Sequence, residues 1–72
     1  MTIRNEFKVH MLNEEGMSKA VGIADGFSHL LTGLELICGA DGREMALVRT
    51  KLQEAAFYAK RAMAEKPENQ RL

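Results

Sequence analysis

The sequence is poor in the residues that usually stabilise a very small protein. It has 72 residues, with one cysteine, one proline and no tryptophan. The lone Cys38 excludes an internal disulfide, and His10 and His29 are too far apart in sequence to suggest a metal cluster. A chain this short buries little of its surface, so we expect one domain that is stabilised by association with other chains.

A surplus of charge of either sign is also lacking. Lysine plus arginine number 10, and so do aspartate plus glutamate, which gives a formal net charge of zero. Binding to long nucleic acid depends on excess positive charge, so we do not expect that partner. A small anion held by a few local cations remains compatible with this composition.

Targeting, membrane and catalytic signals are scarce. The N-terminus, MTIRNEFK, lacks the apolar core of a signal peptide, and we find no apolar run long enough to span a bilayer. We therefore expect a cytoplasmic protein without a membrane partner. Ser18 and Ser28 lack the context of a nucleophile, and GADG lacks the lysine of a phosphate-binding loop. The sequence predicts neither an enzyme nor a cofactor.

What the sequence does contain is helical periodicity, first in residues 13–38. Asn13 is the expected N-cap, and Gly39 is expected to end the helix with a positive φ. Apolar residues recur every three or four positions in two rows, which makes a broad apolar face. The first row contains Met17, Ala20, Ala24, Phe27, Leu31 and Leu34. The second row contains Ile23, Phe27, Leu30, Leu34 and Ile37.

The second helical segment covers residues 43–66, after a turn at residues 39–42. Asp41 and Glu44 match a capping box in which Asp41 is the N-cap. Pro67 opens a polar tail at residues 67–72 and ends the helix. The apolar positions of this helix are Met45, Val48, Leu52, Ala55, Ala59 and Met63.

These segments predict an all-α fold, an antiparallel two-helix hairpin preceded by a short N-terminal arm at residues 1–12. A hairpin covers only one of the two apolar rows, so we expect assembly into a homo-oligomer. Gly22 and Gly26 lie one turn apart and would admit another backbone or a ligand. Phe57 and Tyr58 are adjacent, so we expect one to face the partner helix and the other a neighbouring chain.

Arg43 is the first candidate for ligand binding. It falls in the first turn of the second helix, where backbone N–H groups without intrahelical partners favour phosphate. Thr50 shares a helix face with it and would donate a hydrogen bond to the same ligand. For Arg43, the structural alternative is a surface ion pair with Asp41 or Glu44. For Thr50, the alternative is an ordinary helix-surface residue.

The stretch NEFKVH is the second candidate. It places an aromatic side chain (Phe7), a cation (Lys8) and an imidazole (His10) within four residues, just after Arg4. Stacking on an aromatic face and charge for a phosphate are what a nucleotide ligand requires. The structural alternative is a strand-like arm, with Phe7 and Val9 buried and with Lys8 and His10 in solvent.

Together these motifs resemble a family of small phage proteins, the hairpin domain shared by the anti-CBASS and anti-Thoeris sponges. The resemblance covers residues 3–64, and its second block is the more specific. The arm pattern Asn-x-Phe-x-x-His is matched by Asn5, Phe7 and His10. The helix pattern Arg-Glu-x-x-Leu-x-x-Thr-x-Leu-x-x-Ala is matched by Arg43, Glu44, Leu47, Thr50, Leu52 and Ala55.

The resemblance implies a protein that binds without turnover. Proteins of this family form oligomers, often hexamers, and hold cyclic nucleotide immune signals in pockets between protomers, which starves the bacterial effector. The implied ligands are cyclic di- or trinucleotides or a cyclic ADP-ribose isomer. The implied roles are phosphate contact for Arg43, Lys8 and Arg4, base stacking for Phe7 or His10, and a hydrogen bond from Thr50.

A function of another class also fits the sequence. The exposed apolar row of a helical hairpin would dock a host or phage protein without any small-molecule ligand. Such an interaction module predicts monomers or dimers with an accessible apolar groove. A sponge predicts a closed higher oligomer that retains its nucleotide.

Overall fold

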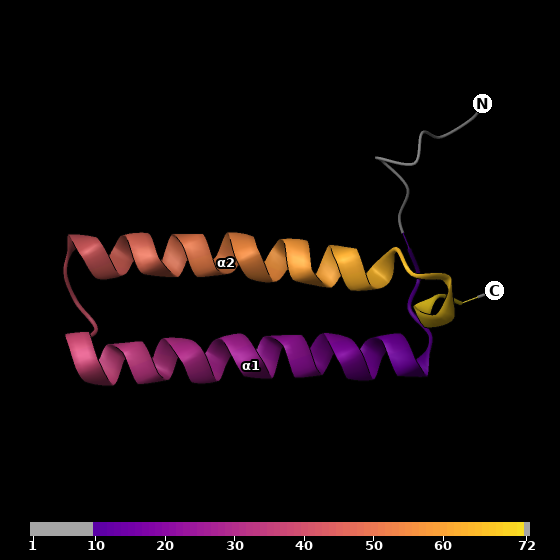
Figure 1. The fold of residues 1–72 in the computed structure, drawn as a ribbon, viewed down its shortest axis with the longest axis horizontal. Coiled ribbons are helices and arrows are strands. Elements are labelled where there is room, and N and C mark those ends of the chain that lie inside the picture. Colours follow the sequence, from indigo (N-terminus) through magenta and orange to yellow (C-terminus); the bar gives the residue numbers. More distant parts are fainter. Residues whose placement is uncertain (1–9, 72) are drawn as a thin grey trace, which may run out of the picture.

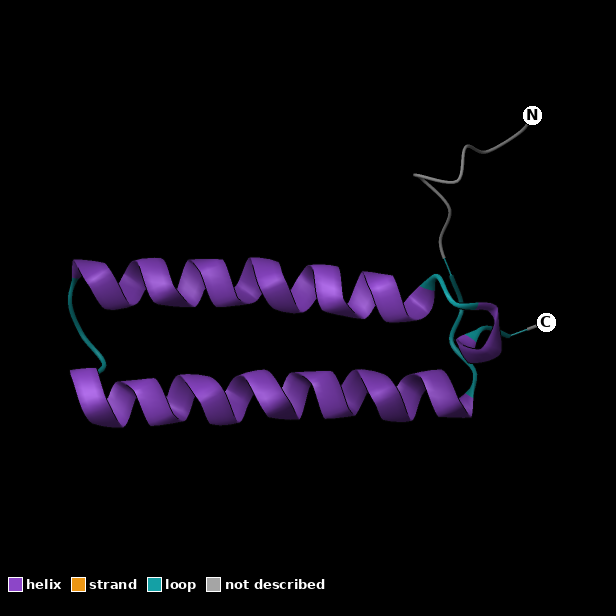
Figure 2. Cartoon of the chain, viewed as in Figure 1, coloured by secondary structure: helices purple, strands orange, loops and turns teal. Residues whose placement is uncertain are grey.

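The computed structural model describes residues 10–71, and these form two long antiparallel helices that lie side by side (Figure 1). α1 spans Glu14–Cys38, α2 spans Arg43–Ala64, and a short 3₁₀ helix, η2, spans Pro67–Asn69. Within residues 10–71 the elements are helical, apart from one isolated β-bridge between Leu12 and Gln70 (Figure 2). The predicted all-α hairpin is therefore confirmed. Most of the predicted arm, residues 1–9, lies outside the described residues, as does Leu72.

α1 begins and ends at residues that satisfy its terminal backbone groups. Asn13 is the N-cap, and its side-chain oxygen accepts a hydrogen bond from the Gly16 N–H at 2.8 Å. At the other end Gly39 has a φ of 85°, in the region that favours glycine, and its N–H donates to the Glu35 carbonyl at 2.8 Å. The prediction of these two caps is confirmed.

The start of α2 differs from the predicted capping box. Gly42, with a φ of 109°, occupies the N-cap position, and no side chain among residues 10–71 caps the helix. The Ala46 N–H donates to the Gly42 carbonyl at 3.0 Å, so the helix begins one residue later than the box requires. Glu44 is then at the second helical position, where it cannot reach back as a third-position Glu does. The assignment of Asp41 as N-cap is wrong.

α2 also ends earlier than predicted, at Ala64 rather than at residue 66. Lys66 is extended, with φ −77° and ψ 125°, because the residue before a proline is disfavoured in the helical region. The following residues are an ordered segment and not a free polar tail. We call residues 67–71 the C-terminal clasp.

The C-terminal clasp packs against the beginning of α1 and closes the open end of the hairpin (Figure 1). The Asn13 N–H donates to the Asn69 carbonyl at 3.0 Å, and the Arg71 N–H donates to the Met11 carbonyl at 2.7 Å. Asn69 is fully buried, at 0% exposure. Its side chain donates to the Met63 carbonyl at 2.9 Å and accepts from the Lys19 ammonium at 2.7 Å.

The described chain is a single layer of two helices and not a compact globule. It measures 47 × 26 × 11 Å, with a radius of gyration of 15.4 Å. A compact domain of this length would have a radius of gyration of about 11 Å. Within residues 10–71 the buried hydrophobic side chains are Met45 and Met63. This arrangement leaves much apolar surface uncovered.

The uncovered apolar surface comes from both helices. One predicted row of α1 lies against α2, with Ala24, Phe27 and Leu31 half-buried, while Leu30 and Ile37 of the other row are 49% and 82% exposed. Large exposed apolar patches mark interaction surfaces. The exposed large apolar residues among those described are Met11, Met17, Val21, Leu30, Leu36, Ile37, Leu47, Phe57 and Tyr58.

By length and composition alone, α1 is long and apolar enough to cross a membrane. This corrects the expectation that the chain has no apolar run of that length. The same test is passed by core helices of soluble proteins and by signal sequences. Glu35 of α1 forms an ion pair with Arg49 of α2 at 3.0 Å, with both side chains about one-third exposed. This ion pair places a charged side chain of α1 against α2.

Candidate functional site

The predicted ligand residues divide into two groups. Arg4, Phe7 and Lys8 lie outside the described residues. His10, Arg43 and Thr50 are described, and their surroundings can be compared with the roles that the sequence suggests.

His10 is half-buried beside the C-terminal clasp. Its Nδ1 atom is 3.1 Å from the side-chain nitrogen of Gln70. The same Gln70 nitrogen donates to the Ala64 carbonyl at 2.8 Å. The imidazole is therefore attached to the folded body of the hairpin and is only partly in solvent.

Arg43 is the first residue of α2 and is exposed. Its guanidinium forms no ion pair or hydrogen bond with any of residues 10–71, so the pairing with Asp41 or Glu44 does not occur there. The first N–H groups of α2 also have no side-chain cap. An exposed cation next to such groups is chemically suited to an anion.

Thr50 lies two turns further along α2 and is exposed. Its hydroxyl donates to the Ala46 carbonyl of its own helix at 3.1 Å. In this rotamer the hydroxyl has only its oxygen lone pairs to offer a ligand, so a donor role requires rotation about χ1.

The three described candidates do not form one site within a chain. Arg43 begins α2 at the turn end, while His10 is tied to Gln70 beyond the other end of α2. Since α2 has 22 residues, roughly 30 Å separate the two ends. A ligand that touches both His10 and Arg43 must therefore lie between different chains.

A hollow of about 540 Å³ lies beside His10, and we call it the clasp-end hollow. It combines an imidazole, a guanidinium and a carboxylate with apolar side chains and the Asn13 amide. The lining residues are His10, Met11, Leu12, Asn13, Glu14, Met17 and Arg71. Arg71 was not predicted as a ligand residue, because nothing in the tail sequence ENQRL indicates that it folds back onto α1.

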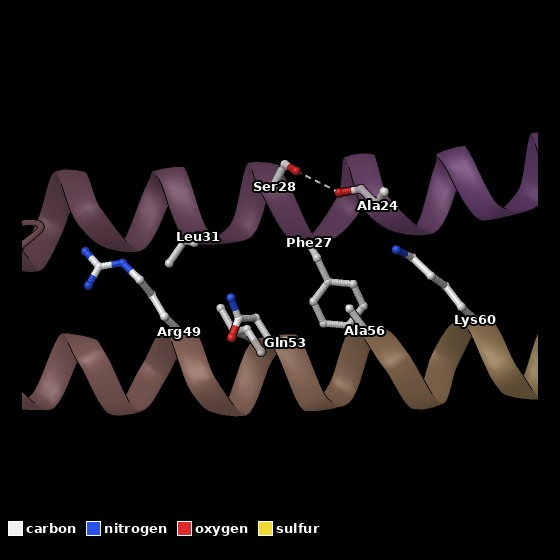
Figure 3. A pocket seen from close by; sticks show the side chains of 9 residues that line it. Ala24, Phe27, Ser28, Leu31, Arg49, Gln53, Ala56 and Lys60 are labelled. Carbon is white, nitrogen blue, oxygen red and sulfur yellow. Dashed lines mark hydrogen bonds between the residues drawn. The ribbon is translucent and has the colours of Figure 1, made fainter.

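A second hollow, the interhelical groove, runs between α1 and α2 and has a volume of about 250 Å³ (Figure 3). The Phe27 side chain points from α1 toward Ala56 of α2, and Arg49 and Lys60 of α2 flank it on either side (Figure 3). The guanidinium of Arg49 already bonds to Glu35 and to the Ala40 carbonyl. Of the two cations that line the groove, Lys60 is the one whose ammonium has no partner among residues 10–71.

A third hollow, of about 280 Å³, is apolar and contains two of the helix glycines. A Cβ atom added at Gly22 or Gly26 would meet nothing within 4 Å in this chain. Each mid-helix glycine costs ~0.5–1 kcal/mol relative to alanine. No contact within the described chain explains this cost, so the two glycines are available for close approach by another molecule.

The aromatic pair Phe57 and Tyr58 is placed differently from the prediction. Both are exposed, at 59% and 63%, and neither is buried against α1. Their rings contact each other edge to face, with centroids 5.3 Å apart and an interplanar angle of 79°. Adjacent helical residues point in different directions, but these large rings bend toward each other on the outer surface of α2.

Residues 10–71 contain no group of three or more histidine, cysteine, aspartate or glutamate side chains placed to hold a metal ion. Comparisons with protein-family models, with curated proteins and with solved structures find no match for this chain.

Proposed function

We propose that this protein is a phage anti-defence sponge that binds cyclic oligonucleotide signals in the cytoplasm of the infected cell without cleaving them. The observation that carries the proposal is the separation of the candidate ligand residues. His10 and Arg43 lie at opposite ends of one chain, so a site built from both needs more than one protomer. Pockets between protomers are what the resemblance to the sponge family implies.

The uncovered apolar surface supports an assembly. A single layer of two helices leaves Leu30, Ile37 and Phe57 about half or more exposed. Burial of apolar area stabilises association at ~25 cal/mol per Å². The formal net charge of zero means that copies of the chain have no net repulsion to overcome. We propose a homo-oligomer, and the family resemblance favours a hexamer.

The surroundings of Arg43 support a phosphate-bearing ligand. Its guanidinium is exposed, without a partner among residues 10–71, at a helix start that lacks a side-chain cap. Arginine binds phosphate through paired N–H donors, and the free N–H groups of the first turn add further donors. In the proposed site Lys8 and Arg4 add charge, Phe7 stacks on a base, and Thr50 adds a polar contact.

Isothermal titration calorimetry with cyclic di- and trinucleotides and a cyclic ADP-ribose isomer tests the proposal. We expect binding to at least one of them and recovery of intact ligand after protease digestion. A folded oligomer that binds none, or that returns a cleaved product, contradicts the proposal.

Arg43→Ala is the matching variant. It is expected to weaken binding by ~1.5–3 kcal/mol, since a charge-assisted hydrogen bond to phosphate is lost. Lys51→Ala is the control, because it removes a cation from the same helix. Among residues 10–71, Lys51 forms one ion pair, an exposed one with Glu54 at 3.8 Å. Equal affinities for the two variants remove Arg43 from the site.

A second candidate function, a protein-interaction module without a small-molecule ligand, is favoured by the exposed aromatic pair. Phe57 and Tyr58 form a contiguous aromatic surface on α2. Aromatic residues are enriched at the energetic centres of protein interfaces. This function predicts monomers or dimers that bind no cyclic nucleotide, and size-exclusion chromatography with light scattering separates it from a closed higher oligomer.

A further inference from the structure

The C-terminal clasp brings groups to His10 that the sequence motifs do not include. Arg71 is the last described residue, and its N–H bonds to the Met11 carbonyl at 2.7 Å. The neighbouring Leu12–Gln70 bridge holds the same two segments together. As a result, Arg71 and His10 line one hollow although they are far apart in sequence.

Gln70 fixes the tautomer of His10. Its side chain lies 2.8 Å from the Ala64 carbonyl, which is only an acceptor, so Gln70 must present its Nε2 donor there and not its oxygen. The second hydrogen of this Nε2 is directed to His10 Nδ1 at 3.1 Å. Nδ1 must then be the acceptor, and the ring hydrogen resides on Nε2. The ring edge that Gln70 does not occupy is thus a hydrogen-bond donor.

The remaining polar groups of the clasp-end hollow differ in their availability. The Asn13 amide is already used, since it accepts from the Gly16 N–H and donates to the Glu68 and Gln70 carbonyls. The Arg71 guanidinium forms no bond with any of residues 10–71. Glu14 is the one carboxylate in the lining. The residues that line the hollow therefore include two donors suited to an anion and one acceptor, beside apolar methionines.

We infer that Arg71 and the Nε2–H of His10 bind a phosphodiester of the cyclic nucleotide, that Glu14 accepts from a base amino group, and that Gln70 acts as a positioning residue. This inference rests on the proposed function and adds three residues that the family motifs do not contain. A nucleotide fits the combination because it carries an anion, hydrogen-bond donors on the base and an apolar ring face.

Calorimetry on the full-length protein tests the contact with Arg71. With the cyclic nucleotide that binds the wild type, Arg71→Ala is expected to lose about 10- to 100-fold in affinity. Lys66→Ala is the matched control, since it removes one exposed cation at the same end of the hairpin without touching the hollow. An Arg71→Ala affinity equal to that of Lys66→Ala overturns the contact while leaving the proposed function intact.

Titration with inorganic phosphate separates a nucleotide site from a simple anion site. We expect phosphate alone to bind far more weakly than the cyclic nucleotide and to compete with it only at high concentration. Phosphate binding as tight as that of the nucleotide overturns the assignment. If the wild type binds no cyclic nucleotide, the proposed function fails, and the ligand part of this inference fails with it.

The role of Gln70 has a test that needs no ligand. Nitrogen-15 NMR of the histidine rings distinguishes the two neutral tautomers. We expect His10 to carry its hydrogen on Nε2 in the wild type and to become a mixture of tautomers in Gln70→Met, with several-fold weaker nucleotide binding. A wild-type His10 with its hydrogen on Nδ1 overturns the positioning role. Since that spectrum is recorded on the wild type, the test survives a variant that fails to fold.

Discussion

The side chain of Asn13 links two parts of the chain that are far apart in sequence. It caps α1 by accepting from the Gly16 N–H and donates to the carbonyls of Glu68 and Gln70 at 2.9 Å and 3.3 Å. Asp41, by contrast, precedes α2 without capping it. Two residues of similar size and similar predicted role therefore contribute very differently to the fold.

This contrast gives a residue-scale prediction. Asn13→Ala is expected to lower the free energy of unfolding by ~2–3 kcal/mol, because a helix cap and the bonds to the C-terminal clasp are lost together. Asp41→Ala is expected to change it by less than ~0.5 kcal/mol, as for an ordinary surface substitution. Urea denaturation at one fixed protein concentration measures both. Equal effects would show that Asp41 does cap α2.

Sequence patterns predict some residues of this protein well and others poorly, for physical reasons. Asn13 and Gly39 act through local backbone geometry, so their roles can be inferred from neighbouring residues. The sequence pattern places Asn69 in a polar tail, although it is fully buried. Its partners, Met63 and Lys19, include one that is 50 residues away. Hydrogen bonds of such sequence separation leave no periodic signal.

At the scale of elements, the apolar periodicity predicts the two helices and their antiparallel pairing. Their exact starts and ends depend on single backbone conformations, such as the positive φ of Gly42. Arg49 illustrates another limit. Its pairing with Glu35 spans 14 residues around the turn, and it becomes evident only once the register of the two helices is fixed. The clasp-end hollow is likewise not evident from the sequence, because it forms only where residues 10–13, the start of α1 and the C-terminal clasp meet.

The C-terminal clasp depends on close packing at Gly16. A Cβ atom added there would lie 2.4 Å from the Asn69 carbonyl oxygen and 3.1 Å from Leu12. Because a backbone atom cannot rotate away, Gly16→Ala is expected to displace the clasp and to cost ~1–3 kcal/mol of stability. Amide hydrogen exchange at Asn13 and Arg71 should then accelerate.

Gly33→Ala is the matched control for this element. Its added Cβ would meet nothing within 4 Å in the chain, so protection at Asn13 and Arg71 should be unchanged. Slow exchange of both amides in Gly16→Ala would show that the clasp is not held by this contact.

At the scale of the whole molecule, the uncovered apolar surface is the dominant feature. The described chain is 11 Å thick, about the diameter of one helix, and its apolar side chains project from both helices. Sequence predicted this surplus, since two apolar rows on α1 exceed what one partner helix covers. The number of copies that cover it is a proposal drawn from the family resemblance.

The hollow lined by Gly22 and Gly26 leads to a prediction about self-association. If a second copy approaches closely there, Gly22→Ala combined with Gly26→Ala should weaken self-association, because the added methyl groups hold the backbones apart. Analytical ultracentrifugation over a concentration series measures the shift toward smaller species. In a chain without such contacts, the two substitutions should instead stabilise α1 by ~1–2 kcal/mol in total.

An unchanged or stronger association of the double variant would place these glycines away from the interface. The circular dichroism of the variant provides the control, since its helical content should equal or exceed that of the wild type.

We propose that an oligomer of this hairpin holds an intact cyclic nucleotide between its chains. Native mass spectrometry after incubation with a panel of cyclic di- and trinucleotides and a cyclic ADP-ribose isomer tests it most directly. We expect a mass equal to several copies of the 8.0 kDa chain plus whole, uncleaved ligand. A single chain, or an oligomer that carries none of these ligands, would contradict it.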